Sequence, residues 1–337
     1  MKQWKLALLA MATMLSTGAL LAGTARAEHI KVGTGPVTAS GPLYIAQDKG
    51  YFAAENLDAE MVSLDAAQSV AQGVVAGDLD IGATAATAAA YNLAASGGLK
   101  IIGGQGREVP TFHGSAFLAS NKAFDAGLTT LKGMEHHTVG IVQIGGPIHY
   151  EVELAAEKYQ VDTETMRIVP LQGLSNLATA LAGNQVDIGV EVNTFALKLS
   201  SSHNAHLIAW VGDETPWQNT LLFAATKTTD QRGKMLEAFM RAYKKGSRDY
   251  YDAFTSADGK RQDGPTAPEI LAILSKHLNQ PAAQLAEGIS YDDPDAKIDV
   301  KDVLHQIKWF KEQKMLPATA DGAAMIDKRY AVPLDGG

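Results

Sequence analysis

The 337-residue chain contains no cysteine. This absence excludes disulfide bonds, thiolate metal ligands and cysteine nucleophiles. It also removes the cysteine through which a bacterial lipoprotein is attached to lipid. An exported form of this chain is therefore expected to be free rather than lipid-anchored.

Basic residues are outnumbered by acidic ones. The 29 Lys and Arg residues against 37 Asp and Glu residues give a formal net charge of −8. Without residues 1–27, which hold Lys2, Lys5 and Arg26 and no acid, the net charge falls to −11. An acidic surface of this kind argues against nucleic acid and anionic membranes as partners.

Long apolar runs are confined to the N-terminus. Two lysines precede an apolar run over 6–21, and residues 25–27 (Ala-Arg-Ala) have the small-x-small pattern of a signal peptidase site. A membrane anchor is the alternative, but Ser16-Thr17-Gly18 interrupts a stretch that is too short to span well. We predict a signal peptide over 1–27, a mature chain that begins at Glu28, and a soluble periplasmic location. The remaining 310 residues suit two domains.

Signatures of catalysis and of cofactor binding are also missing. Gly173-Leu174-Ser175-Asn176-Leu177 lacks the closing glycine of a nucleophile elbow, and Gly33-Thr34-Gly35 lacks the third glycine of a dinucleotide loop. The histidines show no metal-ligand spacing, and the acidic loop over 292–295 lacks the glycine and glutamate of a calcium loop. We expect no catalytic residue, no metal and no cofactor.

Two stretches of the chain share one pattern. Residues 40–52 follow a strand signal over 30–33 and mark a helix start, with Ser40 as a cap, Pro42 at the first position and Gly50 at the end. Residues 145–150 (Gly-Gly-Pro-Ile-His-Tyr) repeat this pattern after a second strand signal. A helix N-terminus at the end of a strand is a place to hold an anion. The repetition indicates two α/β lobes of one design.

The rest of the chain follows an alternation of strands and helices, which is typical of mostly parallel sheets. Thr84 is expected to cap an alanine-rich helix, and Thr266 a later one. The expected strands are 30–33, 57–64, 79–83, 101–104, 117–119, 138–143, 167–170 and 186–192, with 205–211 and 221–224 as the strands of the return crossing between lobes. The expected helices are 42–49, 66–76, 85–95, 147–159, 174–181, 235–254, 268–277 and 300–314.

Several of these motifs together resemble one family, the nitrate/sulfonate/taurine-type periplasmic binding proteins of ABC importers. The resemblance is carried by Pro42-Leu43-Tyr44-Ile45-Ala46, Gly50-Tyr51-Phe52 and Gly77-Asp78-Leu79-Asp80-Ile81-Gly82, and in the second lobe by Leu131-Lys132-Gly133, Val139-Gly140 and Gly183-Asn184-Gln185-Val186-Asp187-Ile188-Gly189. It implies a type II two-lobed fold with two hinge crossings, which closes on a ligand in the cleft before docking on a membrane permease. Lobe one would be 28–106 plus 220–337, and lobe two the inserted segment 107–219. The loop Val190-Glu191-Val192-Asn193-Thr194 departs from the patterns of sulfonate and nitrate receptors.

Ligands of open α/β folds sit at the carboxyl ends of strands. Those ends are expected to be the loops 34–41, 83–87, 143–150 and 191–194, joined by the two crossings. We therefore predict a binding site for a small organic anion formed by Thr38, Ser40, Gly41, Tyr44, Thr84, Thr87, Arg107, His113, Gly146, His149, Glu191, Asn193 and Trp217.

Several of these assignments have a structural alternative. The hydroxyl groups could simply cap helices. Arg107 could pair with an acid group of the ligand, or with Glu108 or a surface partner. Trp217 could be a flat wall of the cleft or part of the hinge packing, and Tyr44 has the same two interpretations.

The leading functional hypothesis is a monomeric receptor that delivers its ligand to an ABC permease. An aromatic carboxylate is favoured slightly over an alkylsulfonate, with Arg107 as the counter-charge. One alternative is an enzyme similar to thiamine-pyrimidine synthases or related lyases on the same fold, which the signal peptide and the missing cysteine disfavour. Another is a receptor that serves a membrane sensor.

Overall fold

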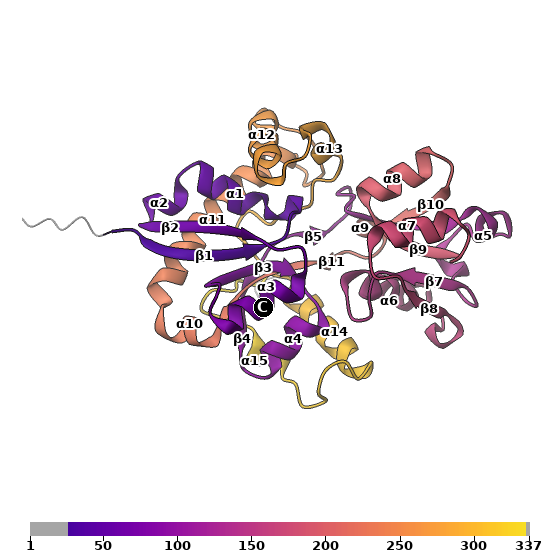
Figure 1. The fold of residues 1–337 in the computed structure, drawn as a ribbon, viewed down its shortest axis with the longest axis horizontal. Helices are drawn as coiled ribbons and strands as arrows, with labels where there is room; N and C mark the ends of the chain where they lie inside the picture. The colour runs from indigo at the N-terminus through magenta and orange to yellow at the C-terminus, as the bar shows by residue number, and fades with distance from the viewer. Residues whose placement is uncertain (1–25, 335–337) are drawn as a thin grey trace, which may run out of the picture.

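The structure is a computed structural model that describes residues 26–334. The predicted signal peptide, apart from Arg26 and Ala27, lies outside these residues. The two ends of the molecule are two five-stranded sheets flanked by helices, and a pair of short strands lies between them (Figure 1). This confirms the predicted two-lobed α/β fold. Lobe one is defined below by the first sheet and lobe two by the second.

The sheet of lobe one has the strand order β2-β1-β3-β12-β4. Strand β1 pairs in parallel with β2 and β3, whereas β12 runs antiparallel to both of its neighbours. Four of its five strands therefore point the same way. The strands are β1 (Glu28–Thr34), β2 (Leu57–Ser63), β3 (Ile81–Ala85), β4 (Leu99–Gly104) and β12 (Thr220–Ala225).

The sheet of lobe two has the order β10-β6-β9-β7-β8. Strand β7 pairs in parallel with β8 and β9, and β6 runs antiparallel to β9 and β10. The carboxyl ends of β7 and β9 thus lie at one edge of this sheet. The strands are β6 (Ser115–Ser120), β7 (Thr138–Ile141), β8 (Arg167–Pro170), β9 (Ile188–Val192) and β10 (Ala205–Trp210).

Helices of differing length flank the two sheets. Those of lobe one and of the C-terminal segment are α1 (Gly41–Asp48), α2 (Tyr51–Ala54), α3 (Ala67–Ala76), α4 (Ala88–Ala95), α10 (Thr226–Gln231), α11 (Gly233–Phe254), α12 (Ala267–Leu278), α13 (Ala282–Glu287), α14 (Val300–Glu312) and α15 (Gly322–Met325). Those of lobe two are α5 (Asn121–Asp125), α6 (Pro147–Tyr159), α7 (Leu174–Ala182), α8 (Asn193–Ser201) and α9 (Val211–Glu214). Among residues 26–334, none of the helices is both long and apolar enough to cross a membrane.

The strands between the lobes are β5 (Arg107–Glu108) and β11 (Trp217–Gln218), which pair antiparallel with Trp217 opposite Glu108. The expectation that 205–211 and 221–224 form the return crossing is wrong. Strand β10 is an edge strand of lobe two, and β12 lies inside the sheet of lobe one. Sequence patterns mark both as strands, but only the pairing partners, which are far away in the chain, decide where each strand lies.

Three predicted helix caps differ in the structure. Helix α4 begins later than expected because β3 continues to Ala85, and Thr87 rather than Thr84 caps it by accepting a hydrogen bond from the amide of Ala90 at 3.2 Å. Ser40 and Thr266 occupy the cap positions of α1 and α12, but neither side chain makes a capping hydrogen bond. The helices are therefore held chiefly by the packing of their buried faces.

Helix α14 of the C-terminal segment packs against α6 of lobe two. The hydroxyl group of Tyr150 in α6 lies 2.9 Å from Oδ1 of Asp302 and 2.7 Å from Nδ1 of His305, both in α14. Asp302 also accepts a hydrogen bond from the amide of Gln218 in β11 at 2.8 Å. One apolar cluster includes Trp217 together with residues of both sheets and of α14. The two lobes are therefore connected by packing as well as by the crossings.

Candidate functional site

The two lobes meet where loops leave the ends of their strands. At the start of α4 in lobe one, the amide of Ala88 donates a hydrogen bond of 3.0 Å to the carbonyl oxygen of Gly145 in lobe two. Gly145 has a φ of +72°, which favours glycine. A Cβ at this position would lie 3.0 Å from the Cβ of Ala88 and 3.1 Å from the sulfur of Met315. We call this region, where the loops after β1, β3, β7 and β9 are expected to converge, the interlobe junction.

Two predicted hydroxyl groups of lobe one are engaged within their own lobe. Thr38 donates a hydrogen bond of 2.7 Å to the carbonyl oxygen of Gly288. Ser40 is fully buried, and its hydroxyl lies 2.7 Å from that of Thr34 and donates to the carbonyl oxygen of Gly35 at 2.8 Å. These bonds fix the turn between β1 and α1.

The next two predicted residues pack against the C-terminal helices. Tyr44 is buried and stacks on His277 of α12 with the ring centres 4.5 Å apart. A Cβ at Gly41 would come within 2.5 Å of the ring of Tyr250 in α11, so glycine allows this close approach. Both residues are thus part of the contact of α1 with α11 and α12.

The predicted threonines after β3 are both buried. Thr84 lies in β3 opposite Leu221 of β12, and Thr87 caps α4. These positions place Thr87 one residue before the interlobe hydrogen bond of Ala88.

Arg107 lies in hinge strand β5 and forms an ion pair. Its Nη2 is 3.0 Å from Oδ2 of Asp299, and the Arg107 and Asp299 side chains are 13% and 27% exposed. The structural alternative considered from the sequence, an ion pair with an acid of the protein, is therefore the one observed, although the partner is Asp299 and not Glu108. The positive charge is neutralised by the residue that precedes α14.

His113 and Asn193 lie close together at the start of β6. Asn193 donates a hydrogen bond of 2.7 Å from Nδ2 to the carbonyl oxygen of His113, and its amide donates to Gly114 at 2.8 Å. The ring of His113 stacks on Trp210 at 4.4 Å, with Nε2 3.2 Å from Asp213. Asn193 is 4% exposed, and its Oδ1 has no hydrogen-bond partner among the described residues.

The loop before α6 holds the predicted residues Gly146 and His149. Gly146 precedes Pro147 at the helix start, and a Cβ there would lie 2.8 Å from the Cγ of Gln143. His149 accepts a hydrogen bond from the amide of Gly145 at 3.2 Å. Burial lowers the pKa of His149 to about 4, so this imidazole is neutral at pH 7 and can act as the acceptor.

Glu191, at the end of β9, is completely buried. Neither of its carboxyl oxygens has a hydrogen-bond partner among residues 26–334. Because burial disfavours the charged form, the pKa of Glu191 is raised to about 8. An acid in this position is costly for the ligand-free protein.

Two further buried acids lie at or next to the hinge. From the sequence, Glu108 was considered only as a partner of Arg107, and Glu151 was not considered. Glu108 pairs with Trp217 across the hinge strands and lies against Gly114 and Ser115. Glu151 of α6 lies near Ser115 and near the indole of Trp217, and both contacts lower its pKa against the larger effect of burial.

Burial raises the pKa of both acids, and the proximity of Glu151 raises that of Glu108 further. A signal for Glu151 was present in the sequence. It lies three residues after Ile148 and four before Ala155, on the buried face of α6.

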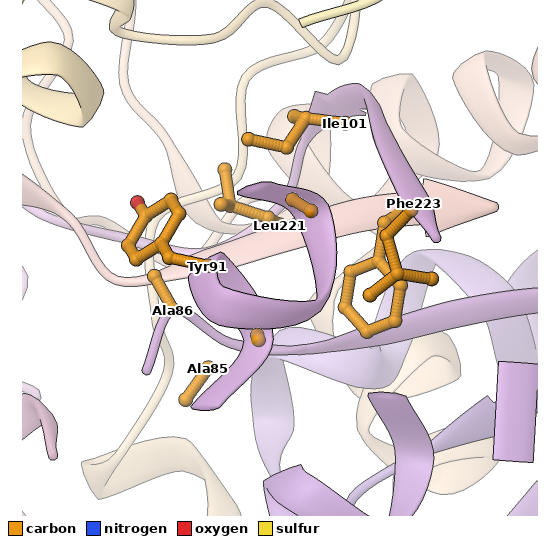
Figure 2. A pocket seen from close by; sticks show the side chains of 9 residues that line it. Ala85, Ala86, Tyr91, Ile101, Leu221 and Phe223 are labelled. Atoms are coloured by element: carbon orange, nitrogen blue, oxygen red, sulfur yellow. The ribbon is translucent and has the colours of Figure 1, made fainter. Parts of the chain in front are cut away.

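Two hollows occur elsewhere in the molecule. An apolar cavity of about 20 Å³ in lobe one is lined by side chains from α4, β4 and β12, including Tyr91, Ile101 and Leu221 (Figure 2). A larger hollow of about 340 Å³ lies between α6 and α14 and is lined by acids such as Glu153 and Glu157. None of the predicted binding residues lines either hollow, and within residues 26–334 no group of three or more His, Asp or Glu side chains is arranged to hold a metal.

Comparison with models of protein families shows to which family the chain belongs. The family model described as NMT1/THI5 like matches residues 37–253, which is more than half of the chain. The chain belongs to the NMT1/THI5-like family. A search of curated protein sequences finds no match.

Solved structures share the fold of this NMT1/THI5-like chain. The periplasmic aliphatic sulphonate binding protein SsuA from Escherichia coli has a TM-score of 0.70 and 14% identity, covering 92% of this chain and 94% of that chain. The periplasmic nitrate-binding protein NrtA from Synechocystis PCC 6803 has a TM-score of 0.64 and 14% identity, covering 88% and 84%. The Candida albicans CA3427 gene product has a TM-score of 0.66 and 18% identity, covering 91% and 98%. At these identities the likeness shows the fold, which is that of periplasmic binding proteins.

Proposed function

We propose that this protein is the substrate-binding component of an ABC importer, which binds a small molecule between its lobes and delivers it to a permease. The proposal includes a periplasmic location, a monomeric state and the absence of catalysis. It also includes the division of the chain into 28–106 plus 220–337 as lobe one and 107–219 as lobe two. The SsuA and NrtA proteins named above are periplasmic binding proteins, which supports this role.

The observation that carries the proposal is the hydrogen bond between Ala88 and Gly145 at the interlobe junction. The loops that make it follow strands of different lobes and run into the helix starts of α4 and α6. Such helix starts bring free backbone N–H groups to one place, and an open α/β fold binds ligands at the ends of its strands. A contact that can open and close there, about the short strands β5 and β11, supports capture of a ligand by lobe closure.

The charge of the ligand is a separate question from the receptor function. An organic anion, either an aromatic carboxylate or an alkylsulfonate, was expected to pair with Arg107. The pairing of Arg107 with Asp299 removes the main support for that expectation, while the helix starts of α4 and α6 remain compatible with it. The receptor function does not depend on this choice.

The receptor function can be tested without knowing the ligand in advance. A thermal-shift screen of the purified protein uses nitrate, taurine, benzoate, propanesulfonate, propylamine and benzamidine as probes. A probe that binds only the folded protein raises Tm with its concentration. We expect one chemical class to do so and to be recovered unchanged, with small-angle scattering showing compaction on binding. Chemical conversion of the bound probe, or no response together with no small molecule released from the denatured sample, would contradict the proposal.

A further inference from the structure

Unpartnered buried acceptors are concentrated at the end of β9. Both carboxyl oxygens of Glu191 and the Oδ1 of Asn193 are buried without a hydrogen-bond partner among the described residues. The two side chains are two positions apart, at the end of a strand and the start of α8. Buried polar groups in folded proteins are nearly always paired, so three unpartnered oxygens on two residues this close in the chain call for a missing partner.

Two further buried acids lie beside the neighbouring strand β6, at a residue whose side chain faces the other side of the sheet from that of Glu191. Glu191 lies opposite Ala116 of β6, while Glu108 and Glu151 lie at Ser115, one residue earlier. One carboxyl oxygen of Glu108 and one of Glu151 also lack a hydrogen-bond partner within residues 26–334.

Within residues 26–334, none of the ion pairs involves these acids, and the cation nearest to them in the chain has another partner. Arg107, next to Glu108 in the chain, pairs with Asp299 instead. Burying an uncompensated acid is unfavourable, and proteins retain such a group mainly where function needs it. A ligand that donates hydrogen bonds or carries positive charge would satisfy the free oxygens.

We propose that Glu191 and Asn193 bind a positively charged, hydrogen-bond-donating nitrogen group of the ligand, such as an ammonium or amidinium group. This inference rests on the proposed receptor function and names the class of its substrate. A cation at hydrogen-bonding distance favours the ionised carboxylate, so the pair formed is charge-assisted. An anionic group in the same position would find a donor only in the proton of a neutral Glu191, and it would penalise ionisation of that acid further.

Two pairs of probes with matched shape and opposite charge test this proposal. Benzamidine and benzoate are both planar aromatics, and propylamine and propanesulfonate are both short aliphatic chains. Binding of each is measured by calorimetry and by thermal shift on the wild-type protein and on two variants. Glu191→Gln removes the charge and keeps the shape, and Glu164→Gln makes the same change at an exposed position of lobe two.

We expect a cationic probe to bind the wild type and the Glu164→Gln variant equally, and to bind Glu191→Gln at least about tenfold more weakly. Asn193→Ala is a second variant, expected to weaken binding by about threefold to tenfold through loss of one acceptor. Equal binding of the cation to wild type and Glu191→Gln would overturn the assignment. Binding of the anions but not of the cations would overturn the inference and leave the receptor function intact.

The remaining outcome is that no probe binds. It tests the inference about a cationic ligand separately from the proposed receptor function. If no probe binds at about 10 mM, the inference fails for the cation classes it names. Mass spectrometry of the denatured protein then shows whether the receptor function fails as well. A co-purified small molecule would preserve that function, and its absence would count against it.

Discussion

The guanidinium group of Arg107 lies 3.0 Å from the carboxylate of Asp299 and joins hinge strand β5 to the start of α14. Asp299 also caps α14 by accepting a hydrogen bond from the amide of Asp302 at 3.0 Å. One side chain thus holds both the hinge and the helix that contacts lobe two. Arg107 is therefore better explained as a structural residue of the hinge than as the counter-charge of a ligand.

This ion pair leads to a first prediction. Arg107→Ala is expected to lower the free energy of unfolding by about 2 kcal/mol, because it leaves the partly buried Asp299 without its cation. Ligand affinity is expected to change by less than about threefold. Urea unfolding of Arg107→Ala, Asp299→Ala and the double variant would give the coupling energy. A coupling near zero, or a large loss of affinity for an anionic ligand, would contradict this role.

The contact between Ala88 and Gly145 allows the lobes to be locked together. The chain has no cysteine, so Ala88→Cys with Gly145→Cys would place a single pair of thiols at the junction. The Cβ atoms would start at 3.0 Å and must separate by less than about 1 Å to reach the usual disulfide spacing. The oxidised variant is expected to exchange ligand at least about tenfold more slowly than the reduced one. Equal exchange rates in both states would mean that this contact does not gate the site.

The hydroxyl group of Tyr150 is expected to stabilise the packing of α6 on α14. Tyr150→Phe removes the hydrogen bonds to Asp302 and His305 and leaves the ring contacts in place. The free energy of unfolding is expected to fall by about 1–2 kcal/mol, because Asp302 and His305 stay in place at the helix contact but each loses a hydrogen-bond partner. Chemical denaturation would measure this, with Tyr159→Phe in the same helix as a comparison. An unchanged stability would mean that water replaces the hydroxyl group.

The burial of Glu191 predicts an unusual dependence of stability on pH. In the folded protein its pKa is raised to about 8, above the ordinary value of 4.5, so the folded state binds more protons between these pH values. The contribution of Glu191 to stability is therefore full below pH 4.5 and is lost as the pH rises towards and through 8.

Glu191→Gln does not titrate and is expected to avoid this loss. Near pH 4.5 the ligand-free variant and the wild type are expected to have similar stability. At pH 8.5 the variant is expected to be more stable by on the order of 4–5 kcal/mol. Thermal unfolding across this pH range would test it, with Glu164→Gln as the exposed control. A difference in stability between Glu191→Gln and the wild type that does not grow with pH would show that Glu191 is paired or hydrated.

Local patterns were sufficient for much of the fold. Helix α6 was predicted with its observed bounds, Pro147–Tyr159, because a glycine, a proline and an apolar face mark it within a few residues. Thr84 and Thr87 could not be told apart in the same way. The pairing of β3 with β12, which comes much later in the chain, extends β3 to Ala85 and moves the start of α4.

The candidate site was less predictable because its chemistry depends on distant partners. The partner of Arg107 is almost two hundred residues away at Asp299, and no spacing rule connects them. Glu191 and Asn193 were placed in a ligand loop from the position of a strand end, but their lack of partners is visible only in three dimensions. Glu151 could have been noted as an acid on an apolar helix face.

The position of β12 has a consequence for how the molecule folds. This strand completes the sheet of lobe one between β3 and β4, yet it follows the whole of lobe two in the chain. An emerging chain thus presents lobe two complete while lobe one still lacks an inner strand. Closing such a long loop is slow relative to forming local contacts. We infer that lobe two forms first and that the last step of folding inserts residues 220–225, which leaves β3 and β4 exposed to chaperones and proteases until then.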